Sequence, residues 1–270
     1  MKRAQRLRFP VVLVAAALAF AGPDTFADSG RNPPGDSHKP VHRGFGPGET
    51  LRFLMEWTVI DLAEITLGVC DDPREEGMWQ IEMRLRSTGV VEAMGYTARD
   101  TVVTTVDSET LLPSRFRFHG YYGSRDSTRR RDSLYIFEQG RQILHEGGGA
   151  FPCSVKVHNL LSGMYWLRGK RPAVGDTITI PVFARSRQET RLTAVAMVAR
   201  RREVVSTPVG RFPALVLEQL QPADERGRRR GPGMFIWITD DERRMPVRFQ
   251  IGSGLRKLVV GLVAIGGPVE

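Results

Sequence analysis

The chain has 270 residues, of which 41% are hydrophobic and 26% charged, and its formal net charge is +9 at pH 7. This length and composition allow one sizeable core, so we expect one domain, with two domains as the alternative. The positive charge does not indicate nucleic acid as a partner, because the chain begins with an export signal and its arginines are not interleaved with aromatic residues.

Residues 1–21 are predicted to be a signal peptide. A basic start is followed by "FPVVLVAAALAF", which is too short to span a bilayer, and Ala19 and Ala21 supply the small residues of a cleavage site. A second candidate cut follows Ala27. No cysteine follows either cut, so we expect a soluble periplasmic protein without a lipid anchor. Residues 1–21 hold four basic and no acidic residues, so the formal charge falls from +9 to +5 without them.

Residues 22–47 are rich in Pro, Gly and polar residues, and we expect a flexible leader there. A single β-rich domain is expected at 48–266. It begins with "TLRFLMEWTV", in which every second residue is apolar, and "IDLAE" at 60–64 is interpreted as a hairpin connection. In "MWQIEMRLRST" the apolar residues again alternate with polar ones, which predicts a strand with one solvated face.

Further short strands are predicted along the rest of the chain. They lie at 98–106, 114–121, 132–138, 141–146, 177–184, 189–200, 203–206, 213–220, 233–239, 246–251 and 256–265. Such a succession, joined by turn signals, indicates a mainly β fold: a single antiparallel curved sheet that forms a barrel or half-barrel.

One segment, 154–168, has helical periodicity instead. Val157, Leu160, Leu161, Met164 and Tyr165 follow the spacing of one helix face, and Gly169 suits the C-terminal cap. We expect this main helix to pack against the sheet. Two interpretations stay open: the helix plugs the core, or it is a lid over an apolar ligand cavity.

The acidic run Asp240, Asp241 and Glu242 stands between two apolar strands. It could form a carboxylate site or a turn. We interpret it as a turn, because Asp favours turns and nothing holds adjacent carboxylates in an opposed, dry geometry. If one of the three caps the turn, Asp240 is the candidate, and its replacement would then cost about 1 kcal/mol.

Two arginine runs hold much of the remaining positive charge. They are Arg129, Arg130 and Arg131 within 124–133, and Arg228, Arg229 and Arg230 within 225–231. Both segments are poor in apolar residues. They are interpreted either as polar hairpin tips or as an anion-binding surface that faces lipid headgroups or an anionic polysaccharide.

Five motifs resemble, in order, an exported bacterial family, the domain of unknown function 3108. They are "GETLRFLMEW", "DSETLLPSRFRF", "HNLLSGMYWLRG", "STPVGRFPALVLEQ" and "MFIWITDDERRMPVRFQI", which together span about residues 48–252. The chain departs from the family at 60–64. The resemblance implies an exported β-rich fold and supplies no catalytic residue. Two strand pairs are also similar to periplasmic lipoprotein carriers built as half-barrels, an analogy at the level of the fold.

Residues with reactive side chains are few. The five histidines, which are His38, His42, His119, His145 and His158, lack zinc-site spacing, and no nucleotide-binding or hydrolase motif is present. Cys153 and His158 could pair as nucleophile and base. We instead predict a Cys70–Cys153 disulfide, which would stabilise the fold by about 4–5 kcal/mol, with two free thiols as the alternative.

The sequence therefore favours a non-catalytic envelope protein that binds a lipid or other apolar ligand. The predicted ligand-binding residues are Trp57, Trp79, Leu161, Met164 and Trp237. No cofactor or metal is expected, and we expect a monomer with no transmembrane segment after signal removal. An enzyme acting on envelope carbohydrate or lipid, and a module that docks on an envelope protein, are the alternatives.

Overall fold

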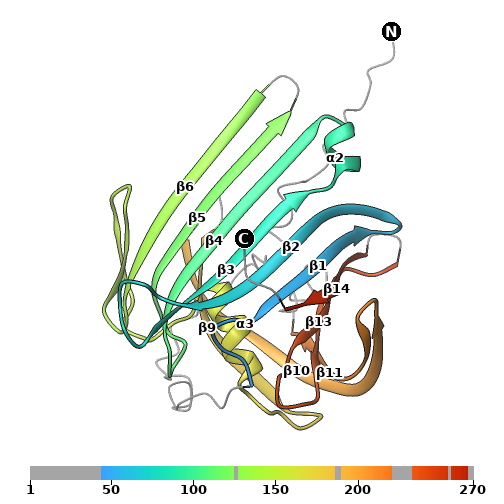
Figure 1. Ribbon diagram of the computed structural model, residues 1–270. Helices are drawn as coiled ribbons and strands as arrows, with labels where there is room; N and C mark the ends of the chain where they lie inside the picture. Colours follow the sequence, from blue (N-terminus) through green and yellow to red (C-terminus); the bar gives the residue numbers. More distant parts are fainter. Residues whose placement is uncertain (1–43, 125–126, 186–189, 221–232, 255–256, 267–270) are drawn as a thin grey trace, which may run out of the picture.

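The computed structural model describes residues 44–124, 127–185, 190–220, 233–254 and 257–266. These residues form one 14-stranded antiparallel sheet with two helices (Figure 1). The predicted fold class, a mainly β fold built on a single curved antiparallel sheet, is confirmed. The predicted signal peptide and almost all of the predicted leader lie outside the described residues.

The strands follow one another as hairpins in two arms. The strand bounds are β1 Thr50–Trp57, β2 Ile60–Asp71, β3 Met78–Ser87, β4 Tyr96–Asp107, β5 Pro113–Ser124, β6 Ser127–Glu138, β7 Gln142–His145, β8 Ala150–Pro152, β9 Thr177–Arg185, β10 Thr190–Thr207, β11 Gly210–Gln219, β12 Met234–Thr239, β13 Pro246–Ile251 and β14 Leu258–Ile265. The arms, β1 to β8 and β14 back to β9, join where β1 pairs with β14. The first and last strands of the described chain are therefore neighbours.

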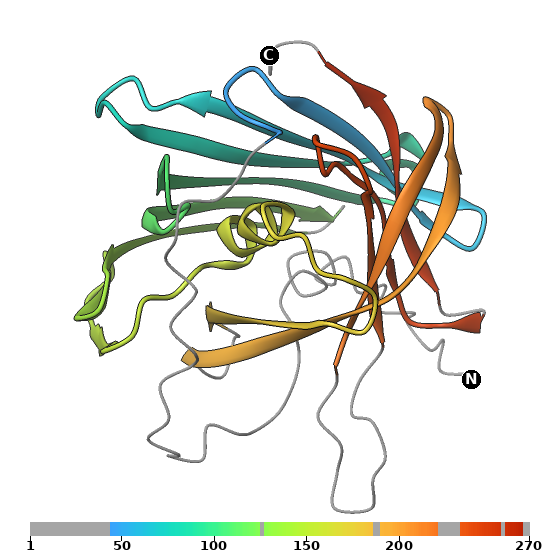
Figure 2. The ribbon, with the colours of Figure 1, turned by 90° about the horizontal axis from the view of Figure 1, so that it is seen from below.

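The sheet curls so that one face of most strands turns inward (Figure 2). Register shifts interrupt the pairing between Met55 and Glu56, between Thr105 and Val106 and between Ala199 and Arg201. Such bulges bend a strand and increase its twist. The inward side chains, among them Leu51 and Phe53, form the main buried apolar core.

The two edge strands, β8 and β9, do not pair with each other. The segment between β8 and the main helix lies along β9 instead: His158 N–H donates to Pro181 O, and Phe183 N–H donates to His158 O. On the other side, the Gln139 side chain exchanges two hydrogen bonds with the Val157 backbone, at 2.9 and 3.0 Å. We call the line along which the two arms meet without a strand pair the seam. A chain segment, rather than a pair of strands, therefore bridges this part of the seam.

The main helix, α3, spans Leu160–Arg168, so the predicted start at 154 is wrong. Asn159 caps it: its side-chain oxygen accepts from Ser162 N–H, and Ser162 Oγ accepts from Asn159 N–H. This capping box fixes the first turn, because both side chains satisfy backbone donors that a helix start leaves free. Gly169 is the C-cap, but with φ of −73° it does not adopt the left-handed conformation.

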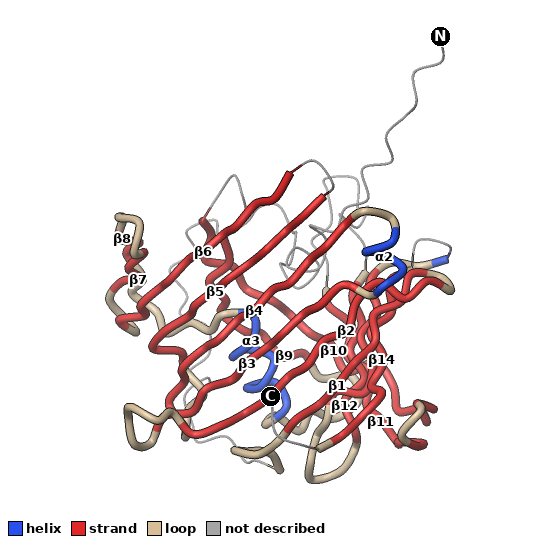
Figure 3. Tube along the Cα trace, turned by 45° about the horizontal axis from the view of Figure 1, so that its top comes forward, coloured by secondary structure: helices blue, strands red, loops and turns tan. Residues whose placement is uncertain are grey.

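A second, short helix, α2, spans Gly89–Ala93 between β3 and β4 and was not predicted. Figure 3 shows it at the ends of these strands, apart from α3. No helix in the described part of the chain is long and apolar enough to cross a membrane.

Two segments that were predicted to connect strands belong to strands instead. The segment 60–64 belongs to β2, and the turn is Thr58 and Val59, with Thr58 at φ of 61°. Neither residue is the Gly or Asn that marks most two-residue turns, so the sequence signal is missing. The first arginine run, interpreted as a hairpin tip, lies within β6.

The predicted Cys70–Cys153 disulfide is wrong. Cys70 lies exposed on β2, and Cys153 is buried just after β8, six strands further along the sheet. At about 4.8 Å per strand the thiols lie far beyond the separation that a disulfide spans. Cys153 Sγ instead donates to Val155 O at 3.1 Å.

Candidate functional site

Helix α3 lies inside the curl of the sheet (Figure 2). A cavity of about 40 Å³ separates it from the inner face of β9, β10, β12 and β13. The lining is entirely apolar: Leu160, Gly163, Met164, Leu167, Ile180, Val182, Val195, Met197, Met234, Ile236 and Phe249. Leu160 and Met164 are only half-buried, so this end of the cavity lies near solvent.

Three of the lining residues are methionines, Met164 on the helix and Met197 and Met234 on the sheet. Methionine is unbranched and has three rotatable bonds, so it adapts its shape more readily than Leu, Ile or Val. The cavity wall can therefore change shape without a change in the backbone.

Gly163 lets the helix approach β9 closely. A Cβ atom at this position would lie 3.4 Å from both the His158 Cβ and the Ile180 Cγ2 atoms. The neighbours would have to shift by a few tenths of an ångström to accommodate it. Gly163 therefore leaves this part of the cavity lining without a side chain.

The start of α3 is held by a buried polar contact. Asn159 Nδ2 donates to Thr104 Oγ1 on β4 at 2.6 Å, and Thr104 Oγ1 in turn donates to Arg115 O. Because the seam contacts of His158 adjoin this contact, the N-terminal end of α3 is fixed to β4 on one side and to β9 on the other.

The other end of α3 carries a fully buried arginine. Arg168 donates from Nη1 and Nη2 to the two carboxylate oxygens of Glu49 at 2.6 and 2.7 Å, and from Nε to Arg244 O at 2.9 Å. Its guanidinium also lies over the Phe45 ring, at 4.1 Å from the centroid. Bidentate geometry and extra acceptors are the conditions under which a buried ion pair offsets its desolvation.

The acidic turn belongs to the same cluster. Asp241 Oδ1 accepts from Thr239 Oγ1 at 2.6 Å and from Arg244 N–H at 3.0 Å, which supports Arg244 in the left-handed region at φ of 48°. Arg244 donates to Lys170 O beyond the helix. Glu49, Arg168 and the turn 240–245 are hereafter the anchored end. The turn interpretation is confirmed, but the capping residue is Asp241 rather than Asp240.

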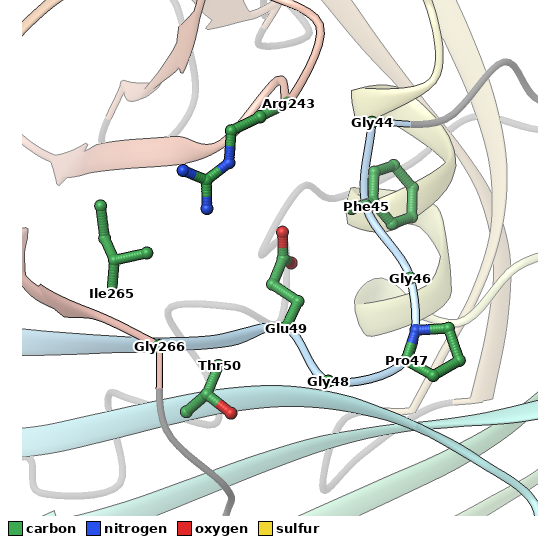
Figure 4. A pocket seen from close by; sticks show the side chains of 10 residues that line it. All are labelled: Gly44, Phe45, Gly46, Pro47, Gly48, Glu49, Thr50, Arg243, Ile265 and Gly266. Carbon is green, nitrogen blue, oxygen red and sulfur yellow. The ribbon is translucent and has the colours of Figure 1, made fainter.

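A larger pocket, of about 390 Å³, opens beside the anchored end (Figure 4). It is lined by Gly44, Phe45, Gly46, Pro47, Gly48, Glu49, Thr50, Arg243, Ile265 and Gly266. Several of these residues are exposed, and the Glu49 carboxylate already pairs with Arg168. This pocket is thus an open, mostly polar hollow, less suited to an apolar ligand than the cavity under α3.

Of the predicted ligand-binding residues, only Met164 lines the cavity. Leu161 is buried elsewhere in the core. Trp57 and Trp79 lie at opposite ends of the first three strands. Trp237 faces outward, where its Nε1 donates to Glu203 Oε1 at 2.5 Å. The structure does not bring these five residues together, because alternation within one strand does not show which end or face meets the helix.

The first predicted arginine run is split between two faces. Side chains alternate along a strand, so Arg129 and Arg131 share the face of the inward Tyr135 and Phe137, whereas Arg130 points to the other face. All three are exposed. Arg228, Arg229 and Arg230 lie outside the described residues.

Two buried groups on the inner side of the fold have altered proton affinity. Burial raises the pKa of the Asp100 carboxyl on β4, although the Tyr122 hydroxyl, which donates to its Oδ2 at 3.0 Å, and the charge of Arg131 act in the opposite direction. Burial likewise raises the pKa of Tyr165 on α3. Asp100 Oδ1 has no hydrogen-bond partner within the described residues.

The described residues contain no group of three or more His, Cys, Asp or Glu side chains placed to hold a metal ion. His119 pairs with Asp132 on the outer face of β5 and β6, and His158 is buried at the seam. Cys153 contacts a backbone carbonyl, and burial raises the pKa of its thiol, so it is a poor nucleophile.

The sequence reasoning missed the Glu49–Arg168 pair. One signal was available, because Arg168 follows Leu161 and Tyr165 at i+7 and i+3 and so falls on the apolar stripe of the helix. A charged residue on such a stripe requires a buried partner. The sequence could not identify Glu49 as that partner, 119 residues away.

The fold is similar to that of a solved protein whose domain has no known function. A β-barrel-like protein with a domain of unknown function, DUF1849, from Brucella abortus is 11% identical with a TM-score of 0.53, covering 81% of this chain and 96% of that one. A predicted lipoprotein from Parabacteroides distasonis is 8% identical with a TM-score of 0.36, covering 84% and 99%.

A predicted exported protein with a YmcC-like fold from Bacteroides fragilis is 8% identical with a TM-score of 0.34, covering 84% of this chain and 100% of that one. No curated protein matches the sequence. A family profile matches residues 52–258, most of the β sheet, and by this match the chain belongs to the family described as Protein of unknown function (DUF3108).

Proposed function

We propose that the protein is a non-catalytic periplasmic binding protein for a lipid or another ligand with an apolar chain. The observation that carries this proposal is the wholly apolar, methionine-lined cavity between α3 and the sheet. A cavity without polar groups stays dry and favours an apolar occupant. Export by residues 1–21 would place the protein among envelope lipids.

The cavity is too small to hold an acyl chain as it stands. Its volume is about 40 Å³, whereas ligand sites are on the order of 300–1,000 Å³. Since both ends of α3 are held by buried hydrogen bonds, we infer that the helix stays in place and the side chains make room. Met164, at the half-buried end, is the residue whose rotation would open the cavity.

The test is titration with a fluorescent fatty acid. The wild-type protein should enhance the probe fluorescence saturably. Val195→Phe, which places a ring in the cavity, should weaken binding at least tenfold. The matched control is Val204→Phe, because Val204 is 55% exposed and lies outside the cavity. Thermal unfolding of each variant shows whether it remains folded.

An unsaturable response of the wild type would contradict the proposal, as would equal affinities of Val195→Phe and wild type. Native mass spectrometry gives a second measurement. Protein exported by its own leader and purified from a periplasm should carry a bound lipid, and the Val195→Phe variant should lose that mass.

A further inference from the structure

Arginines without a salt-bridge partner gather at one end of the sheet. Among the described residues, Arg86, Arg99, Arg129, Arg130 and Arg131 form no ion pair. All five are exposed and lie near the tips of β3, β4 and β6. Figure 1 shows these tips together at the upper end, away from α3. We call this surface the basic end.

Three of these arginines share one cross-strand row. Arg86 lies opposite Arg99, Arg99 opposite Tyr121, and Tyr121 opposite Arg130. Neighbouring strands are about 4.8 Å apart, and like charges directly opposite each other destabilise a sheet. Glu64 lies opposite Arg86 on its other side, but the contact between Arg86 and Arg99 is itself unfavourable for folding, which indicates a role outside folding.

Some arginines elsewhere on the sheet are compensated. Three consecutive residues of β10 each pair with an acid: Arg200 with Glu218, Arg201 with Glu203 and Arg202 with Asp240, at 2.5, 2.7 and 2.6 Å. Arg52, Arg117 and Arg211 are also exposed and form no ion pair within the described residues, but they lie apart on β1, β5 and β11. What distinguishes the basic end is that five such arginines lie close together near neighbouring strand tips.

The acidic groups on β4 and β6 near the basic end are already engaged. Asp100, buried beside Arg99, accepts a hydrogen bond from the Tyr122 hydroxyl. Asp132 pairs with His119, and Glu92 accepts a hydrogen bond from Ser87. Glu64 is the cross-strand neighbour of Arg86 but forms no ion pair with it within the described residues. Asp61 lies at the start of β2, on the side away from β6. The positive charge therefore persists around β4, β5 and β6.

The same end exposes apolar side chains. Val59 in the β1–β2 turn is 86% exposed, and Val90 and Met94, in α2 and at its end, are 49% and 50% exposed. Thr88 joins the two elements, because its hydroxyl donates to Asp61 O at 2.6 Å. Single exposed apolar residues are ordinary. Their position beside uncompensated arginines is what distinguishes these three.

We infer that the basic end docks on a membrane surface that contains anionic lipids. Arginines bind phosphate groups, and exposed apolar side chains beside them enter the boundary between headgroups and acyl chains. A soluble polyanion would need the arginines but not Val59, Val90 and Met94, so the apolar residues favour a membrane. The inference does not depend on a ligand in the cavity under α3.

The experiment is sedimentation with vesicles, using protein exported by its own leader and purified from a periplasm. Vesicles of phosphatidylglycerol and phosphatidylethanolamine should bind the protein, and vesicles of phosphatidylcholine alone should not. The triple variant Arg86→Gln, Arg99→Gln, Arg130→Gln should lower the partition coefficient about a hundredfold. The control triple Arg200→Gln, Arg201→Gln, Arg202→Gln removes the same charge from β10 and should change it much less.

The apolar residues give the decisive comparison. Val90→Asp should also weaken vesicle binding, whereas Val204→Asp, at an equally exposed position on β10, should not.

Absence of binding to anionic vesicles would overturn the inference, as would equal losses in the two arginine triples. Unchanged binding of Val90→Asp, with equal affinity for soluble dextran sulfate, would overturn the membrane assignment in favour of a polyanion. Val195→Phe should bind vesicles like wild type, which separates this test from that of the ligand cavity.

Discussion

The anchored end and the basic end use arginine in opposite ways. At the anchored end, Arg168 is fully buried and engages Glu49 and two backbone carbonyls, those of Arg243 and Arg244. At the basic end, Arg99 and its neighbours are exposed and form no salt bridge within the described residues. The same residue type is thus structural at one end and available for binding at the other.

The difference shows at which end of the fold side chains can be replaced without unfolding the protein. The anchored end joins segments that are far apart in sequence, since Glu49 lies 119 residues from Arg168. Removing one member leaves others unpaired in a dry environment. The basic end is built from local hairpins, whose backbone bonds do not depend on the side chains at their tips.

The largest expected effect is that of Arg168→Ala, which tests whether the arginine at the anchored end is structural. We expect it to lower the free energy of unfolding by about 3–5 kcal/mol, because the Glu49 carboxylate would stay buried without its partner. The control is Arg171→Ala, whose pair with Glu242 is solvent-exposed and should contribute about 0.5 kcal/mol or less. Urea unfolding measures both. Equal losses would mean that the buried pair does not anchor α3.

Next in size is the difference between two helix residues. Leu161→Ala should cost about 2–5 kcal/mol, as truncation of a buried core residue does. Met164→Ala should cost about 1–2 kcal/mol, because Met164 is half-buried and already borders a void. Urea unfolding at matched protein concentration compares them. If Met164→Ala were the more costly, the methionine would be a core residue and not the movable wall of a cavity.

The sequence predicted the sheet better than the site. Alternation in segments such as Trp79–Leu85 reports directly which face is buried, so strands and fold class followed. Helical spacing at 154–159 suggested a longer α3 because Val157 fits the pattern. In the structure Val157 is held at the seam by Gln139, a long-range contact that sequence periodicity does not contain.

The candidate site depends on which strands face α3. Ile180, Met197, Met234 and Phe249 come from four strands, and their convergence follows from the pairing of β1 with β14 and the curl of the sheet. The tryptophans looked more suitable because of their size. The outward Trp237 shows the error, since β12 is buried on both faces and alternation could not indicate which side meets the helix.

A pH-dependent test concerns Asp100, which is buried on β4 next to Arg99 of the basic end. Burial raises its pKa above the ordinary 3.8, so the folded state holds this proton more tightly than the unfolded state. The stabilisation that this proton contributes is therefore fully present below pH 3.8. It is lost as the pH rises through the raised pKa of the folded state. Relative to Asp100→Asn, which has no such proton, wild type should lose stability across this window. Urea midpoints at several pH values measure it, and a constant difference would contradict the assignment.

A smaller effect is expected at the acidic turn. Asp241→Ala should cost about 1 kcal/mol, because Asp241 accepts the hydrogen bonds that support the turn. Asp240→Ala should cost about 0.5 kcal/mol, since Asp240 makes a surface pair with Arg202 and only a long contact, 3.7 Å, with the buried Arg244. Thermal unfolding of the two variants decides between them. A larger loss for Asp240→Ala would restore it as the capping residue.

The smallest expected effect is a gain in the free energy of unfolding at the basic end. It tests directly whether the arginines there are unnecessary for folding. Arg99→Gln removes a like charge opposite Arg86 and breaks no ion pair within the described residues. It should leave the free energy of unfolding unchanged or raise it by about 0.2–0.5 kcal/mol, more at low salt than at high salt.

The matched control for Arg99→Gln is Arg202→Gln, which loses its pair with Asp240 and should be neutral or slightly destabilising. Urea unfolding of both variants at two salt concentrations makes the comparison. A clear loss of stability in Arg99→Gln would show that this arginine serves the fold, and the basic end would then resemble the anchored end. A gain in stability, together with weaker binding to anionic vesicles, would show that Arg99 serves membrane binding and lowers the stability of the fold.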